Sequence, residues 1–123
     1  MRLRNILFVV SNLEKSEAFY RDIFHMVPFS HFEGKVIMSE GLVLQEGALK
    51  EAGEKEDVLL YFEENDMKEF YEELQKKEVR FKDPLYESED GRMVVRIYDP
   101  DFYLIEIGET MDAMRRRKEE NES

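Results

Sequence analysis

The chain has 123 residues, of which 42% are hydrophobic, and it carries a formal net charge of −11. This length accommodates one domain with a workable core. The absence of cysteine excludes disulfides, thiolate metal sites and cysteine nucleophiles. The excess of acids argues against nucleic-acid or membrane partners and favours a cationic ligand through electrostatic steering. Because no apolar run is long enough to span a bilayer and no leader-like segment is present, we expect a cytoplasmic protein.

The first half of the chain reads as a strand, a helix and three short strands. Residues 3–10 form a β-rich stretch in which positions 6–10 are apolar without interruption, and this predicts a strand buried on both faces. Ser11, with Glu14 three residues later, predicts the capped start of an amphipathic helix. His25 follows that helix at a position where a left-handed residue is expected. Three short strands are expected at 28–32, 36–39 and 42–46.

The same pattern recurs in the second half. A strand is expected at 58–62, a helix capped by Asn65 or Asp66 follows, and three further strands are expected at 84–87, 93–98 and 103–107. The pair Asp90-Gly91 is a strong hairpin signal. The dipeptide Phe-Tyr at positions 19–20 returns at positions 70–71, as an internal repeat predicts.

The repeat divides the chain into two modules. We expect one domain built of a first module at 3–46, a charged linker at 47–57 and a second module at 58–108. Residues 109–123 are expected to be a terminal helix or a disordered tail. The alternative is a helix that docks on a partner subunit through Met111 and Met114.

The most informative stretch runs from residue 99 to residue 107. Asp99 and Pro100 predict a type I turn in which the aspartate side chain bonds the backbone ahead. In the strand that follows, Glu106 lies on the same face as Leu104, because side chains alternate along a strand. A carboxylate in an otherwise apolar strand is costly without a partner. We therefore expect a partner for Glu106.

This turn and strand, together with the strand-to-helix segment at 11–22, resemble the vicinal oxygen chelate superfamily of glyoxalases, bleomycin-resistance proteins and extradiol dioxygenases. The family usually has glycine where this chain has Phe102. The resemblance implies an α+β fold with two tandem βαβββ modules, which form a curved mixed sheet around a central cleft. It also implies a homodimer, because relatives cover their open sheets by pairing.

The resemblance further implies a divalent metal held by the first and last strands of each module. Carried over position by position, the ligands fall on Asn5, Gln45, Leu59 and Glu106, and only Glu106 keeps the family's ligand type. One carboxylate and two amides do not supply the three or so ligands of a catalytic transition metal. We therefore expect no metal cofactor. A divalent cation held by the oxygens of Asn5, Gln45 and Glu106 is the alternative.

A ligand pocket is expected where the family places its metal. A concave, mostly apolar site with a few convergent polar groups is the usual arrangement for small-molecule binding. The predicted ligand-binding residues are Asn5, Gln45, Leu59, Glu106, Tyr61, Tyr98 and His31. The alternative is structural: Asn5 and Gln45 only hydrogen-bond Glu106, the tyrosines pack in the core, and His31 is a half-exposed strand residue.

Three functions compete. The first is a metal-independent small-molecule binding protein, similar to the bleomycin-resistance branch, and we favour it because the metal ligands are missing. The second is an enzyme of glyoxalase type, a lyase, isomerase or epimerase, with Glu106 as its catalytic general base or metal ligand. The third is a non-catalytic interaction protein that uses the arginines at 115–117 as a contact surface.

Overall fold

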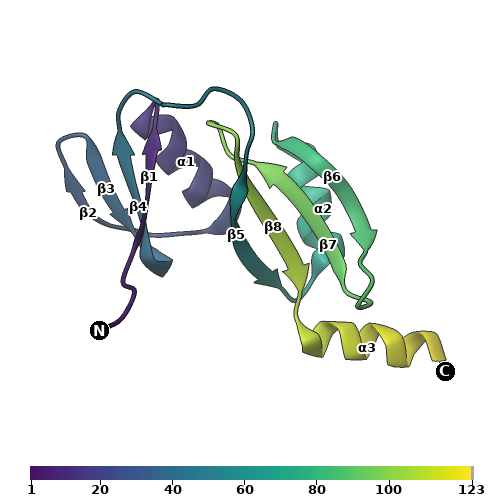
Figure 1. Cartoon of the computed structure of the whole chain (residues 1–123). Helices are drawn as coiled ribbons and strands as arrows, with labels where there is room; N and C mark the ends of the chain where they lie inside the picture. The colour runs from purple at the N-terminus through teal and green to yellow at the C-terminus, as the bar shows by residue number, and fades with distance from the viewer. Residues whose placement is uncertain (123) are drawn as a thin grey trace. The chain divides into compact units, whose positions relative to one another are not determined.

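The computed structural model describes residues 1–122 and forms two compact units, Met1–Gly53 and Glu54–Ser123 (Figure 1). Each unit contains a strand, a helix and three further strands, and each holds its own four-stranded mixed sheet. The α+β class and the two βαβββ modules are thereby confirmed.

The first unit consists of β1 (Ile6–Val10), α1 (Leu13–Phe24), β2 (Pro28–Phe32), β3 (Lys35–Met38), the short 3₁₀ turn η1 (Ser39–Gly41) and β4 (Leu42–Glu46). The strand order is β1-β4-β3-β2, with β1 parallel to β4 and the other neighbours antiparallel. The helix α1 covers one face of this sheet, where Tyr20 and Leu44 are fully buried. The predicted apolar face of α1 is confirmed by burial of Ser16, Tyr20 and Ile23.

Two predictions for the first unit were wrong. The first strand is not buried on both faces: Ile6 is 40% and Leu7 is 47% exposed, because α1 covers one face of the sheet and β1 lies at its edge. The helix cap is Asn12 rather than Ser11, and its Oδ1 accepts a hydrogen bond from the amide of Lys15 at 3.1 Å. The left-handed His25 is confirmed, with φ of 57°.

The second unit consists of β5 (Lys55–Glu64), α2 (Met67–Lys76), β6 (Arg80–Glu87), β7 (Met93–Tyr98), β8 (Tyr103–Glu109) and α3 (Met111–Glu122). Its strand order is β5-β8-β7-β6, with β5 parallel to β8. Since β5 begins at Lys55, the last residues of the predicted linker belong to a strand. Asp66 caps α2 by accepting a hydrogen bond from the amide of Glu69 at 3.1 Å. Within residues 1–122, no helix is both long enough and apolar enough to span a membrane.

The two faces of the second sheet differ in character. On one face, α2 packs against the sheet, and the rings of Tyr71 and Phe81 meet edge to face at 5.7 Å. Val95, Ile97 and Ile105 share this face and are completely buried. The alternate residues of the same strands point to the opposite face. The pairing register places Tyr61, Glu106 and Arg96 side by side on neighbouring strands there.

The turn between β7 and β8 fixes that register. The amide of Phe102 donates to the carbonyl of Asp99 at 3.0 Å, as the predicted turn requires. The Asp99 carboxylate accepts hydrogen bonds from the amides of Asp101 at 2.8 Å and Tyr103 at 2.9 Å. Phe102 has a left-handed φ of 66°, the conformation that glycine adopts most easily.

Candidate functional site

The candidate site lies on the face of the second sheet opposite α2, which we call the polar face. All four strands of the sheet contribute to it, and Tyr61 and Leu59 are 41% and 37% exposed there. Its members, grouped by pairing register and by their side-chain contacts, are Glu56, Leu59, Tyr61, Glu63, Lys82, Asp83, Arg92, Arg96, Tyr98 and Glu106.

The centre of the polar face is an ion pair between Glu106 and Arg96. Arg96 Nε donates to Glu106 Oε1 at 2.8 Å, and Asp83 Oδ2 lies 3.9 Å from Arg96 Nη1. The hydrogen bond to Glu106 raises the pKa of the Arg96 guanidinium, which stays charged. The Glu106 side chain is 18% and the Arg96 side chain 32% exposed. The structural alternative made the amides of Asn5 and Gln45 the partners of Glu106, whereas the structure pairs it with a guanidinium from the adjacent strand.

A second polar group lies beside this pair. The Tyr98 hydroxyl donates to Glu56, and Lys82 Nζ lies 2.7 Å from both oxygens of that carboxylate. The hydrogen bonds from Lys82 and Tyr98 lower the pKa of Glu56. The hydrogen bond to Glu56, reinforced by burial, raises the pKa of Tyr98. The phenol of Tyr98 therefore remains a hydrogen-bond donor at neutral pH.

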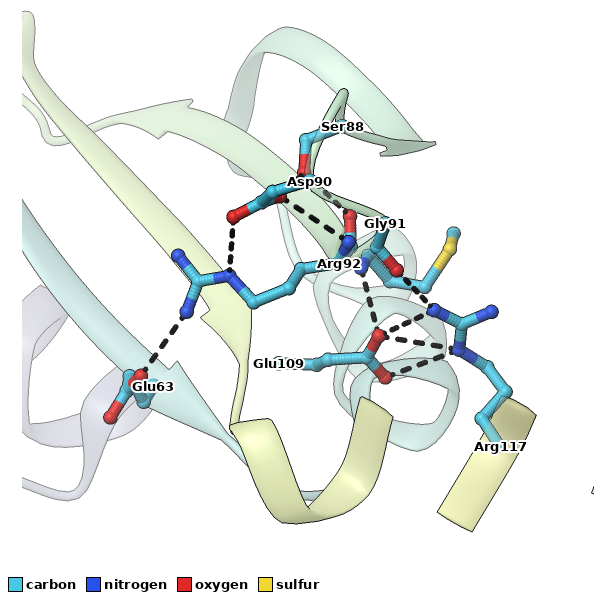
Figure 2. A network of polar contacts seen from close by, with 8 residues as sticks. Glu63, Ser88, Asp90, Gly91, Arg92, Glu109 and Arg117 are labelled. Atoms are coloured by element: carbon cyan, nitrogen blue, oxygen red, sulfur yellow. Dashed lines mark hydrogen bonds and ion pairs between the residues drawn. The ribbon is translucent and has the colours of Figure 1, made fainter. Parts of the chain in front are cut away.

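The side chain of Tyr61 lies against Gly108 on the neighbouring strand and beneath the guanidinium of Arg92. A Cβ at Gly108 would lie 2.6 Å from the Tyr61 hydroxyl oxygen, so glycine makes room for this side chain. The Arg92 guanidinium carbon lies 5.6 Å from the centre of the Tyr61 ring, and Arg92 also forms an ion pair with Glu63 at 3.4 Å (Figure 2). Burial raises the pKa of Tyr61 despite the nearby Arg92. The ring thus presents an aromatic surface with a neutral hydroxyl.

The structure brings together four of the predicted site residues: Leu59, Tyr61, Tyr98 and Glu106 all lie on the polar face. The other three lie in the first unit. Asn5 precedes β1 and is exposed, and Gln45 is an exposed residue of β4.

His31 and Gln45 lie on opposite faces of the first sheet. His31 Nε2 lies 2.5 Å from Oε1 of Glu17, a residue of α1, so His31 is on the helix-covered side. The register, with His31 opposite Val36 and Val36 opposite Leu44, places Gln45 on the other side. Ligand-binding roles for Asn5, Gln45 and His31 stay predictions.

The residues at the implied metal-ligand positions do not fit a metal centre. Leu59 has no donor atom, and Glu106 already accepts a hydrogen bond from Arg96. Asn5 and Gln45 offer neutral amides, which are weak ligands for transition metals. Within residues 1–122, no group of three or more histidine, aspartate or glutamate side chains could hold an ion.

The sequence analysis missed Arg96, although the signal was present. Arg96 is the one charged residue in the strand Met-Val-Val-Arg-Ile-Tyr. A hairpin closed by the turn at 99–102 places residue 96 opposite residue 106, as the structure confirms. A lone cation and a lone acid at paired positions of two apolar strands predict an ion pair.

A separate network surrounds Glu109 at the end of β8 (Figure 2). Glu109 is 4% exposed, and its Oε1 accepts hydrogen bonds from the amide of Met93 at 3.0 Å and from Arg117 Nη2 at 2.7 Å. Arg117 Nη2 also donates to the carbonyl of Gly91 at 2.7 Å. Burial by itself raises the pKa of Glu109, but the hydrogen bonds from Arg117 and Met93 outweigh it and lower the pKa below its ordinary value. This network anchors α3, the terminal helix, to the β6–β7 hairpin.

Comparison with known proteins identifies the fold. The family model described as a glyoxalase-like domain matches residues 3–112. A protein of unknown function from Agrobacterium tumefaciens str. C58 has a similar structure, with 28% identity, a TM-score of 0.80, and coverage of 90% of this chain and 95% of that chain.

Two further solved structures share the fold at lower identity. The lactoylglutathione lyase from Agrobacterium tumefaciens is 21% identical, with a TM-score of 0.68 and coverage of 88% of this chain and 92% of that chain. The fosfomycin resistance protein FosX from Listeria monocytogenes is 20% identical, with a TM-score of 0.74 and coverage of 90% and 92%. No match was found among curated protein sequences.

Proposed function

Because this chain belongs to the glyoxalase-like domain family, we propose that it binds a small organic molecule on the polar face of its second sheet without a transition metal. One observation carries this proposal: Arg96 Nε donates to Glu106 Oε1 at 2.8 Å. The acid that the family resemblance assigns to a metal already has a positively charged partner from its own sheet.

The Arg96–Glu106 pair is suited to hold a ligand. The guanidinium has five N–H donors, and Glu106 occupies one of them. The partly exposed ring of Tyr61 and the side chain of Leu59 supply apolar contact area beside the Arg96–Glu106 pair. An apolar surface with a few fixed polar groups is the usual composition of a small-molecule site.

The charge of the polar face favours a neutral or cationic ligand. Four carboxylates, those of Glu56, Glu63, Asp83 and Glu106, face three cations, those of Lys82, Arg92 and Arg96. The whole chain adds a net charge of −11, which steers cations toward the protein at low ionic strength.

Thermal unfolding in the presence of a panel of neutral, cationic and anionic small molecules tests the proposal. A bound ligand raises the melting temperature, because it binds only the folded state. We expect neutral or cationic aromatic compounds to raise the melting temperature of the wild type by several degrees, and both Glu106→Gln and Arg96→Gln to abolish this shift.

Asp112→Asn is the matched control, because it also removes one negative charge but lies on α3, where Asp112 is exposed and forms an ion pair with Arg115. The control should keep the full shift. The proposal is wrong if Glu106→Gln folds normally and responds to every compound as the wild type does.

The glyoxalase-type enzyme is the alternative for the same site. In that case Glu106 would act as a general base, and a bound compound would be converted rather than only retained. Analysis of the compound after incubation with the wild type and with Glu106→Gln separates the two functions. Recovery of unchanged compound from both supports binding alone.

The homodimer is a second proposal that rests on the family's pairing of open sheets. Sedimentation equilibrium measures it directly. A mass of twice 14.8 kDa is expected, and a single-chain mass at all concentrations would contradict it.

A further inference from the structure

A cleft of about 550 Å³ lies within the second unit, away from the polar face. It is bounded by the start of α2, by β6, β7 and the end of β8, and by α3, and its lining residues are Asn65, Asp66, Met67, Lys68, Leu85, Met93, Glu109, Ala113, Arg116, Arg117 and Glu120. We propose that this cleft is a second binding site, which takes a small amphipathic anion with an apolar body and one sulfonate or carboxylate group.

The inner face of α3 leaves the cleft open. The residues that line it from this helix are Ala113, Arg116, Arg117 and Glu120, which follow the spacing of one helix face. A helix that only packs on a sheet carries large apolar residues on that face. Here the buried position is the small Ala113, 7% exposed, and the others are long polar side chains. The helix is therefore held at its place without filling the space beneath it.

The position of α3 depends on the Glu109–Arg117 network rather than on apolar packing. Arg117 reaches from the helix to the Glu109 carboxylate and to the carbonyl of Gly91, both at 2.7 Å (Figure 2). Thr110 adds a hydrogen bond from its hydroxyl to the side chain of Asn65 at 2.7 Å. These contacts fix both ends of the cleft wall.

The floor of the cleft is apolar. Met67 is 4% exposed, and Leu85 and Met93 are partly buried beside it. Methionine side chains are unbranched and polarizable, and they adapt to flat or irregular ligands. The floor therefore suits an aromatic or short aliphatic body.

The unpaired charges at the cleft are positive. The acids Asp66 and Glu109 are engaged, Asp66 as the cap of α2 and Glu109 with Arg117, and Glu120 also has a partner. Lys68 and Arg116 line the cleft from opposite helices, and neither has a polar partner among residues 1–122. Two free cations above an apolar floor match a molecule that is apolar at one end and anionic at the other.

The net charge of −11 does not prevent this selection. Exposed charges farther away than about 8 Å are largely screened at physiological ionic strength. The contacts inside the cleft therefore decide which ligands bind. The volume of the cleft also lies within the range of about 300–1,000 Å³ that is typical of small-molecule sites.

The dye 8-anilinonaphthalene-1-sulfonate tests the proposal, because it joins an aromatic body to one sulfonate and fluoresces when bound. N-phenyl-1-naphthylamine has the same rings without the sulfonate and serves as the matched control ligand. We expect saturable binding of the sulfonate dye to the full-length wild type. The two dyes are compared in full-length Glu106→Gln, whose polar face should no longer take neutral aromatic compounds, and there the uncharged analogue should bind at least tenfold more weakly.

Substitutions locate the binding. Lys68→Gln and Arg116→Gln should each weaken binding of the sulfonate dye about threefold, as the loss of one partly exposed charge contact implies. Ala113→Leu should reduce it more strongly, because the added side chain fills the cleft. Arg115→Gln is the control on the same helix, since Arg115 does not line the cleft and pairs with Asp112.

Binding of the sulfonate dye in the cleft can be told apart from ligand binding on the polar face. Glu106→Gln should leave binding of the sulfonate dye unchanged, because Glu106 lies on the opposite face of the sheet. The proposal is overturned if the sulfonate dye does not bind, if both dyes bind Glu106→Gln equally, or if Lys68→Gln, Arg116→Gln and Arg115→Gln all bind the sulfonate dye with wild-type affinity.

Discussion

Two glutamates of β8, Glu106 and Glu109, lie three residues apart on opposite faces of the same sheet, and each is paired with an arginine. Glu109 is 5% exposed at its side chain and accepts hydrogen bonds from both a backbone amide and Arg117. Glu106 is 18% exposed and accepts one hydrogen bond, from Arg96. Both pairs join a glutamate to an arginine, but the acceptor sites of Glu109 are filled, whereas Glu106 keeps acceptor sites that a ligand can use.

The difference separates structure from function. A buried carboxylate whose acceptor sites are filled holds two elements together and has nothing left for a ligand. A partly exposed carboxylate with a single donor keeps free acceptor sites beside free guanidinium N–H groups. We therefore assign Glu109 to the docking of α3 and Glu106 to ligand binding.

Removal of Arg117 should have the largest effect on stability. Arg117→Ala leaves Glu109 buried with only the amide of Met93 as a donor, and the expected loss is about 3 kcal/mol in the free energy of unfolding. Urea denaturation measures it. Arg115→Ala on the same helix should cost less than about 0.5 kcal/mol, because its ion pair with Asp112 is exposed. Equal losses in the two variants would contradict the anchoring role.

The matched amide substitutions compare the two glutamates directly. Glu109→Gln should cost about 2 kcal/mol, because it removes the charge from a buried hydrogen-bonded pair. Glu106→Gln should cost about 1 kcal/mol or less, because its pair is partly exposed. Urea denaturation of both variants in the same buffer gives the difference. A larger cost for Glu106→Gln would mean that Glu106 is the structural residue of the two.

Acid should weaken the Glu109 network. Because the pKa of Glu109 is lowered in the folded protein, its contribution to stability is present above the glutamate pKa of the unfolded chain and is lost as the pH falls through the folded pKa. The difference in unfolding free energy between the wild type and Glu109→Gln should therefore shrink from about pH 7 to about pH 3. A difference that does not change with pH would show that the charge is unimportant.

A smaller effect is expected in the first unit, at a buried polar group of α1. Ser16 Oγ lies on the buried face of this helix and forms no hydrogen bond with any group of residues 1–122. Ser16→Ala removes the unsatisfied hydroxyl and should stabilise the protein by up to about 1 kcal/mol. Thermal unfolding checks it, and a clear loss of stability would reveal a partner for this hydroxyl.

The sequence predicted the fold more completely than the site. The periodicity of the helices and the turn at 99–102 were sufficient for both modules, and the end of the first helical pattern was sufficient for the left-handed His25. The edge position of β1 was missed because an apolar run does not reveal how many neighbours a strand has. Arg96 was missed because a strand charge becomes informative only when its cross-strand partner is identified.

The anchoring of α3 was also beyond the sequence pattern. The polar composition of residues 109–123 permits a helix or a disordered tail equally well. The position of the helix depends on contacts between segments far apart in the sequence, such as those from Arg117 to Glu109 and Gly91, and no local spacing predicts such contacts.

The central claim is that Glu106 is committed to Arg96 and serves a ligand without a metal. Isothermal titration of the purified, chelator-treated protein with Mn²⁺, Ni²⁺ and Zn²⁺ tests it most directly. We predict no stoichiometric binding of any of the three ions to the wild type, and the same result for Glu106→Gln. One equivalent of a tightly bound ion in the wild type, lost in Glu106→Gln, would contradict it.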